Sequence, residues 1–255
     1  DNSCFIENLA FSGRLARTNK GSNTAFRGFG GPQGMVVIET ALDDIAEYLK
    51  MDPAEVRAVN FYGGKPGRDR TPYGQTFEDD DNPLSELWHD LKASSDYGSR
   101  RQGIESFNAQ SPIYKRGIAM QAVKFGISFT TSFLNQAGAL VLVYADGSVQ
   151  VNHGGVEMGQ GLHAKIINVV VRELGVRRDQ VRMMRTSTDK VPNTSATAAS
   201  SGSDLNGFAV ARACIRIRGM MAEVAERILG GPADQMVFRD GAVRSDNGES
   251  MPFRA

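Results

Sequence analysis

Cysteine and histidine are scarce in this sequence. Among 255 residues there are two cysteines, Cys4 and Cys214, and three histidines. Two cysteines so far apart form neither the closely spaced ligand pairs of a zinc site nor a disulfide framework. This usage is typical of a reducing compartment, and we therefore expect a cytoplasmic protein.

The chain also lacks an excess of either charge and a long apolar run. Its 29 lysines and arginines are balanced by 29 aspartates and glutamates, which argues against nucleic acid or an anionic membrane as the main partner. No apolar run is long enough to span a membrane, and no segment has the pattern of a signal peptide. We therefore expect a protein that is neither secreted nor inserted in a membrane.

The length allows a sizeable core, arranged as one large domain or two smaller ones. The chain begins at Asp1 without a methionine and ends directly after a hairpin-like pattern. We therefore expect an internal piece of a longer polypeptide.

The first part of the chain is mainly helical by pattern. Apolar residues recur at helical spacing over residues 34–49, which predicts a helix with one buried face. Asp52 stands before a proline and a glutamate at the spacing of a capped helix start. Residues 63–83 are rich in glycine, proline and aspartate, which predicts a long loop. A further helix is expected after Asn82-Pro83, with one face formed by Leu84, Leu87, Trp88 and Leu91.

The second part mixes strands and helices. Residues 118–129 and 139–144 are strand-like, and Asp146-Gly147 predicts a hairpin turn into a strand with buried Val149 and Val151. Further along, the expected elements are a helix over 161–174 ended by Gly175, a strand over 181–186, a long helix over 203–229 and a hairpin around Asp240-Gly241.

The order of these elements lacks a strict βαβ repeat, and the fold class predicted is therefore α+β. We expect two domains, a mainly helical part over residues 1–112 and an α+β part over residues 113–255.

Residues 22–34, with the sequence SNTAFRGFGGPQG, combine features that a plain turn does not need together. Arg27 stands between Phe26 and Phe29, inside a run of four glycines and a proline. Glycine allows close approach of a ligand to the backbone, arginine binds planar oxyanions, and phenylalanine stacks on flat heterocycles. We interpret Phe26 as a packing residue and the other two as candidates for ligand contact.

Two later loops have the composition of ligand-binding turns. Residues 154–161, GGVEMGQG, lie between an expected strand and an expected helix, where glycine N–H groups and the helix N-terminus favour an anion such as phosphate. Residues 197–201, TAASS, precede the long helix and combine small side chains with hydroxyl groups. Taken alone, the first loop is more typical of a structural turn, and the second is also typical of a common serine-rich helix cap.

Four segments together resemble one family. Residues 22–34, 124–130 (KFGISFT), 154–163 and 192–200 (PNTSATAAS) resemble, in order and approximate spacing, the molybdenum-cofactor domain of the xanthine dehydrogenase and aldehyde oxidase family. The resemblance implies that family's α+β molybdopterin-binding fold and a molybdenum-molybdopterin cofactor. The cofactor neighbours that it implies are Arg27, Met158, Gly159, Gln160, Ala198, Ala199 and Ser200. Among these, Arg27 and Ala199 would lie beside the molybdenum without being ligands of the metal.

The same resemblance implies a substrate site. Phe29 and Phe129 would clamp a flat substrate between their rings, and Thr130 would form a hydrogen bond to it. In this family the general base is a glutamate in a Gly-Glu-Pro setting, which this chain lacks; Gly248-Glu249-Ser250 is only superficially similar. We therefore expect no catalytic residue in this chain, which would be incomplete and inactive alone.

Two histidines and one glutamate could be considered for metal binding or catalysis. His153 and His163 are ten positions apart without a carboxylate or cysteine at ligand spacing, and we interpret both as structural. Glu157 lies inside the glycine-rich segment, but the family's catalytic glutamate is elsewhere, so we do not interpret Glu157 as the base.

The resemblance favours purine hydroxylation, from hypoxanthine to xanthine to urate. Gly31 and the residues that follow it are more similar to xanthine dehydrogenases, because animal aldehyde oxidases tend to have a bulkier residue there. Two alternatives stay open: an aldehyde or N-heterocycle oxidoreductase, and a non-catalytic apo fragment that acts only in folding and subunit association. The expected partners are a module or subunit with 2Fe-2S clusters, FAD and NAD, and further copies in a homo-oligomer.

Overall fold

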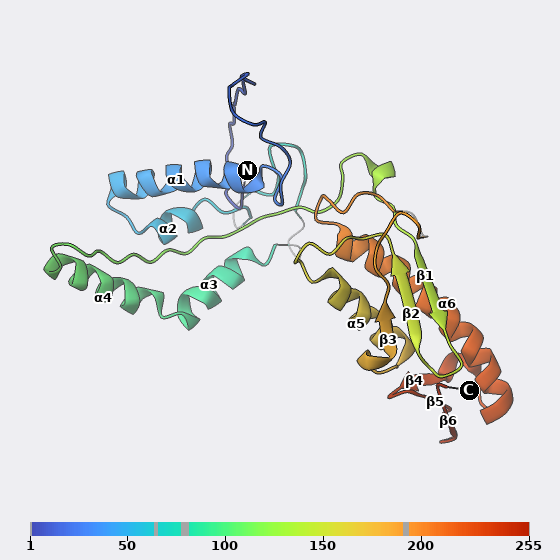
Figure 1. The fold of residues 1–255 in the computed structure, drawn as a ribbon. Helices are drawn as coiled ribbons and strands as arrows, with labels where there is room; N and C mark the ends of the chain where they lie inside the picture. Colours follow the sequence, from blue (N-terminus) through green and yellow to red (C-terminus); the bar gives the residue numbers. More distant parts are fainter. Residues whose placement is uncertain (1, 64–65, 78–81, 191–193, 255) are drawn as a thin grey trace. The chain divides into compact units, whose positions relative to one another are not determined.

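The computed structural model describes residues 2–63, 66–77, 82–190 and 194–254. Their contacts divide the chain into two compact units, Asp1–Phe125 and Gly126–Ala255, and each is described by itself. The first unit is helical, and the second combines helices with small sheets (Figure 1). The α+β class is therefore confirmed. None of the helices in the described residues is long and apolar enough to cross a membrane.

In the described residues, the first unit contains two pairs of helices. Helix α1 (Gly31–Leu49) packs on α2 (Pro53–Ala58), and α3 (Leu84–Ser94) is followed directly by α4 (Tyr97–Gln110). Asp52 caps α2 as expected, because its Oδ1 accepts from the N–H of Ala54 at 2.8 Å. Oδ1 of Asp52 also accepts from the hydroxyl of the buried Tyr97 at 2.9 Å, which ties the start of α4 to the cap of α2.

A buried polar network holds the chain ends of this unit together. The Arg57 guanidinium donates to Oε2 of Glu39 at 2.6 Å, and the Asn2 amide donates to Oε1 of the same carboxylate at 2.8 Å. Asn2 also donates to the carbonyl of Ala122 at 2.8 Å. Arg57, Glu39 and Asn2 all have hydrogen-bond partners. A buried ion pair without such partners would destabilise the fold.

The helix expected after Asn82-Pro83 is confirmed as α3. Of the residues on its predicted face Trp88 is buried, whereas Leu87 and Leu91 are 59% and 49% exposed. Helix α4 has weak amphipathic character, and the pattern of apolar residues did not predict it. The strand expected over 118–129 is wrong. Residues 118–127 have no regular secondary structure and no strand partner in the described chain, and Ser128 is left-handed (φ 79°). This segment is held instead by side chains such as Asn2, which the alternation of residues does not reveal.

The second unit is built on a three-stranded sheet. Its strands β1 (Ala139–Val143), β2 (Val149–His153) and β3 (Val181–Met183) lie in the order β1-β2-β3, antiparallel and then parallel. The predicted hairpin at Asp146-Gly147 joins β1 to β2. The predicted strand over 181–186 is confirmed only for its first half.

Helices α5 (Leu162–Leu174) and α6 (Gly202–Leu229) pack on the sheet and on each other, and Figure 1 shows α6 running behind β1 and β2. Both helices match their predicted ranges, and Gly175 ends α5 in a left-handed conformation (φ 66°). The apolar stripe of α5 is fully buried against the strands and α6, and forms the main core with Val141, Val149, Val151, Val210 and Cys214.

A second small sheet closes the C-terminal end of this unit. Strands β4 (Val237–Arg239), β5 (Ala242–Arg244) and β6 (Ser250–Pro252) pair antiparallel, with the predicted turn at Asp240-Gly241 between the first two. A Cβ at Gly175 would lie 2.3 Å from the backbone carbon of Phe238. Only glycine therefore lets the end of α5 approach β4 this closely.

Candidate functional site

Three sequence motifs meet in the second unit. The backbone N–H of Ser128 donates to the carbonyl of Ala199 at 2.9 Å, which places the segment with Phe129 and Thr130 beside the loop before α6. The N–H of Val156 donates to Oγ1 of Thr197 at 2.9 Å, which joins the glycine-rich loop to that same loop. Motifs widely separated in the sequence are therefore neighbours in space. The first two residues of the fourth motif, Pro192 and Asn193, lie outside the described residues.

The backbone of these loops adopts conformations that side chains disfavour. Ala199 and Ser200 are both left-handed, with φ of 53° and 55°, and so is Ser128 at 79°. Left-handed backbone at non-glycine residues costs free energy and concentrates at binding and active sites. In the described residues, the N–H groups of Ala199 and Ser200 have no hydrogen-bond acceptor. Two adjacent free donors of this kind suit an anionic or polar ligand.

The carboxylate of Glu157 binds backbone N–H groups at the N-terminus of α5. Its Oε1 accepts from the N–H groups of Gly159 and Gly161, each at 2.9 Å, and its Oε2 accepts from the N–H of His163 at 3.1 Å. The N–H of His163, with those of Gly161 and Gly159, lowers the pKa of the Glu157 carboxyl. A carboxylate stabilised as an anion is a poor general base, so the geometry argues against a catalytic role for Glu157.

This arrangement changes the expected anion site. The sequence predicted free N–H groups at the helix N-terminus, but three of them already donate to the protein's own carboxylate. The free donor pair lies instead at Ala199 and Ser200. The backbone at Gly159 and Gly161 borders open space: a Cβ added at either position would have no atom within 4 Å.

The side chain of Gln160 shapes the loop around Met158. Its amide oxygen accepts from the N–H of Met158 at 2.5 Å, and its amide nitrogen donates to the carbonyl of Val156 at 2.8 Å. Met158 itself is 57% exposed. The loop therefore presents Met158 outward on a backbone that the Gln160 amide holds.

Two histidines lie beneath the glycine-rich loop. The rings of His153 and His163 are 5.5 Å apart in an edge-to-face arrangement, and Nδ1 of His153 accepts from the N–H of Gly155 at 3.0 Å. Burial, reinforced by the neighbouring His163, lowers the pKa of His153 to about 4. His153 is therefore neutral near pH 7 and carries its proton on Nε2, where it cannot bind a metal. No group of three or more histidine, cysteine or acidic residues in the described chain could hold a metal ion.

Unsatisfied buried polar atoms gather around these loops. They are Asn152 Oδ1, His153 Nε2, His163 Nε2, Ser195 Oγ and Asn206 Oδ1. Buried polar atoms are normally paired with protein groups, water or a ligand. These five atoms are covered by protein, so the donors that these loops leave for a polar cofactor are the free N–H groups of Ala199 and Ser200.

Asn135 fixes the backbone of the predicted substrate clamp. Its Oδ1 accepts from the N–H of Phe129 at 2.8 Å, and its Nδ2 donates to the carbonyl of Phe129 at 2.7 Å. Phe129 is half-buried and Thr130 is exposed. The sequence did not point to Asn135, because this side chain acts through hydrogen bonds to the backbone of another residue.

The arginine loop lies in the first unit and forms two successive turns. Gly28, Phe29 and Gly30 are all left-handed, with φ of 98°, 45° and 86°. Arg27 is exposed, and Phe29 is 79% exposed. Phe26 is 83% exposed, so its interpretation as a packing residue is wrong. The turn geometry directs these side chains away from the helical core.

At position 31, the first residue of α1, there is no room for a side chain. A Cβ at this position would lie 2.7 Å from Cε2 of Phe125, closer than such contacts occur. A bulkier residue at position 31 would therefore displace the Phe125 ring, which precedes the segment with Phe129.

Comparison with known proteins identifies the family. Two family models described as molybdopterin cofactor-binding domain match the chain, one over residues 90–255 and the other over residues 1–61. The chain belongs to the molybdopterin cofactor-binding domain family. The resemblance seen in the four motifs is thereby confirmed, and molybdopterin is the cofactor that this domain family binds.

The chain is similar to one region of much longer curated relatives. It is 47% identical over 231 residues to "Xanthine dehydrogenase/oxidase" of Gallus gallus, which is 91% of this chain and 17% of that protein. It is 45% identical over 236 residues to "Xanthine dehydrogenase" of Dictyostelium discoideum, 92% of this chain and 17% of that protein. This molybdopterin cofactor-binding domain therefore spans a small part of the relatives that it matches.

Solved structures share the fold. Quinoline 2-oxidoreductase from Pseudomonas putida 86 aligns with a TM-score of 0.70 at 22% identity, over 90% of this chain and 30% of that chain. The aldehyde oxidoreductase from Desulfovibrio desulfuricans ATCC 27774 aligns with a TM-score of 0.60 at 27% identity, over 77% of this chain and 21% of that chain. The domain assignment to 1–112 and 113–255 and the individual cofactor and substrate residues stay predictions.

Proposed function

We propose that this chain is part of a molybdenum hydroxylase that oxidatively hydroxylates purines, such as hypoxanthine to xanthine to urate. The observation that carries the proposal is the 47% identity with a protein named xanthine dehydrogenase/oxidase over 91% of this chain, within the molybdopterin cofactor-binding domain family. The neighbouring positions of the three motif loops in the second unit support it.

Bound molybdopterin would supply the metal centre that takes electrons from the substrate carbon. In the proposal, Ala198, Ala199, Ser200, Met158, Gly159 and Gln160 form the cradle in the second unit. The N–H groups of Ala199 and Ser200 donate to polar atoms of the cofactor. Glu157 and Thr197 act on the cradle without touching the cofactor, because they hold its two loops in shape and together. Arg27, from the first unit, adds a guanidinium for the anionic cofactor.

Phe129 and Phe29 are proposed to clamp the planar substrate, and Thr130 to form a hydrogen bond to it. Asn135 holds the backbone of Phe129, which fixes the position from which the ring extends. The general base, the 2Fe-2S clusters, FAD and NAD would belong to other parts of the longer polypeptide or to a partner subunit. We further propose a cytoplasmic homo-oligomer, and an isolated chain that is inactive.

The test is made on the longer polypeptide of which this chain is a part, together with its partner subunit if it has one. Molybdenum content and the fluorescence of oxidised pterin report cofactor binding, and turnover of hypoxanthine is compared with turnover of benzaldehyde. Bound molybdenum and pterin with faster hypoxanthine turnover are expected. Faster benzaldehyde turnover would favour the aldehyde alternative. Absence of molybdenum and pterin, in a host that makes the cofactor, would favour the non-catalytic alternative.

A further inference from the structure

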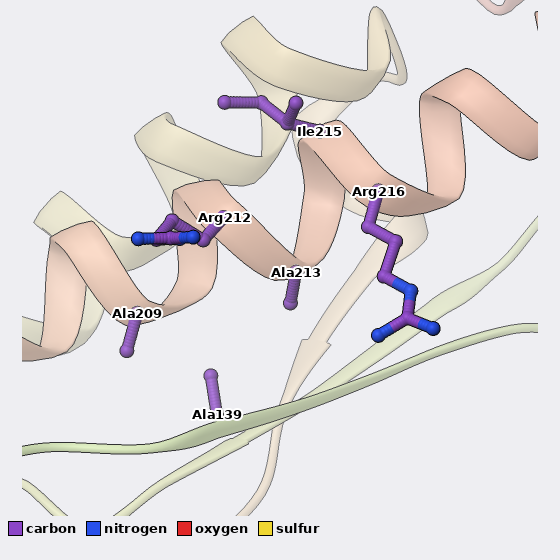
Figure 2. A pocket seen from close by; sticks show the side chains of 6 residues that line it. All are labelled: Ala139, Ala209, Arg212, Ala213, Ile215 and Arg216. Carbon is purple, nitrogen blue, oxygen red and sulfur yellow. The ribbon is translucent and has the colours of Figure 1, made fainter.

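A groove with two arginines lies in the second unit, on the face of α6 that borders β1. It has a volume of about 590 Å³ and is lined by Ala139, Ala209, Arg212, Ala213, Ile215 and Arg216 (Figure 2). Figure 2 shows Ala209 and Ala213 pointing from α6 toward Ala139 on β1, with the Arg216 side chain beside them. The alanine side chains are short, which is why space remains between helix and strand.

The charge in this groove is not balanced by the described part of the protein. Arg212 and Arg216 are one helical turn apart and exposed, and neither has a carboxylate within ion-pair distance among the described residues. Arg218, only two residues further along, is paired with Glu173 at 3.5 Å. Arg212 does rest near the ring of Phe208, at 5.7 Å from its centroid. Two neighbouring guanidiniums without acidic partners favour an occupant that carries carboxylates.

The strand beside the groove has a free edge. The sheet order β1-β2-β3 leaves β1 paired on one side only in the described chain. Leu140 and Leu142 on this strand are each 38% exposed. Unpaired edges of this kind accept a further strand through main-chain hydrogen bonds, with side chains supplying specificity. The small side chains of Ala209 and Ala213 leave room for such a strand against α6.

We infer that an extended acidic segment, supplied by the remainder of the longer polypeptide, adds to the β1 edge and pairs its carboxylates with Arg212 and Arg216. The relatives provide ample chain for this, because the region aligned here is 17% of the length of the Gallus gallus protein. A second copy of this chain fits less well, since a symmetric contact would bring four guanidiniums together. This inference rests on the proposal that the chain is part of a longer polypeptide, but not on the proposed catalysis.

The test uses a zero-length carbodiimide, which couples amines to carboxylates in direct contact. In the longer polypeptide, Arg212→Lys and Arg216→Lys keep the charge and add a reactive amine, and Arg227→Lys on the same helix is the matched control. Mass spectrometry of the cross-linked peptides is expected to show links from positions 212 and 216, at least tenfold above those from 227. The linked aspartate or glutamate is expected outside residues 1–255 of the same polypeptide.

Hydrogen exchange supplies a second measurement on the same protein. The amides of Ala139–Val143 are expected to exchange at least tenfold faster in the double variant Arg212→Glu/Arg216→Glu than in the wild type, whereas Arg227→Glu leaves them unchanged. The inference would be overturned by cross-links only to residues within 1–255 or by cross-links between two copies. It would also be overturned by amide hydrogen exchange in β1 that is unchanged in the double variant. Neither measurement depends on molybdenum or turnover, so either can fail while the proposed function holds.

Discussion

The N–H of Val156 donates to the hydroxyl oxygen of Thr197 at 2.9 Å, although the two residues are 41 positions apart. This hydrogen bond joins the glycine-rich loop before α5 to the alanine-rich loop before α6. Both loops carry predicted cofactor neighbours, so this hydroxyl group directly links the two halves of the proposed cradle.

Replacing Thr197 by valine tests this link. The variant keeps the shape of the side chain and leaves the Val156 N–H without its acceptor, which is expected to cost about 1 kcal/mol of unfolding free energy. Molybdenum content of the intact enzyme is expected to fall, because the loops lose their fixed separation. Thr197→Ser, which keeps the hydroxyl, is the control and should retain the cofactor. Equal molybdenum content in the valine and serine variants would contradict the linking role.

Glu157→Gln tests the carboxylate at the N-terminus of α5. The three N–H groups lower the pKa of Glu157, so its contribution to stability is present above the ordinary carboxyl pKa and is lost as pH falls through the lowered pKa. The variant is therefore expected to be less stable than the wild type at neutral pH, and the difference should vanish at acidic pH. Thermal unfolding across pH measures it. A difference that does not depend on pH would contradict the ionic explanation.

The lowered pKa of His153 predicts a separate loss of stability in mild acid. Its pKa falls from 6.5 to about 4 on folding, so its neutral form contributes stability that is present above pH 6.5 and is lost as pH falls toward 4. The full contribution is on the order of 3 kcal/mol. His153→Asn, whose Oδ1 can still accept from the Gly155 N–H, should flatten this part of the pH–stability curve. His89→Asn, at an exposed position, is the control.

Arg27→Ala tests the arginine loop in the intact enzyme. Charge-assisted hydrogen bonds contribute about 1.5–3 kcal/mol, so losing the guanidinium should reduce cofactor retention by about tenfold or more. Molybdenum content after gel filtration measures the effect, and Arg14→Ala, another exposed arginine of the same unit, is the control. Full molybdenum content with full activity in Arg27→Ala would remove Arg27 from the cofactor site.

Phe129→Ala separates substrate binding from cofactor binding. The variant should keep its molybdenum, because Asn135 contacts only the backbone at this position, and should lose most purine turnover as the stacking surface is removed. Phe133→Ala, at an exposed position nearby in the sequence, is the matched control. Loss of molybdenum together with activity would show that Phe129 supports the fold or the cofactor instead.

Local patterns predicted most of the secondary structure of the second unit. The stripe of apolar residues that ends at Gly175, and the turns at Asp146-Gly147 and Asp240-Gly241, depend on neighbours within a few positions. The pattern was wrong where distant residues decide. The 118–129 segment alternates like a strand, but its described backbone is held by Asn2 and has no strand partner.

The sequence by itself determined the family, because the four motifs are local strings whose order survives in the chain, and it determined the helices and hairpins that position them. Only the tertiary structure decided which loops touch. It brought Ser128 to Ala199 and Val156 to Thr197, and it placed the Glu157 carboxylate on the N–H groups predicted to be free for a ligand. Hydrogen bonds between residues far apart in the chain depend on how the core packs α5 and α6 on the sheet, and no local pattern encodes that arrangement.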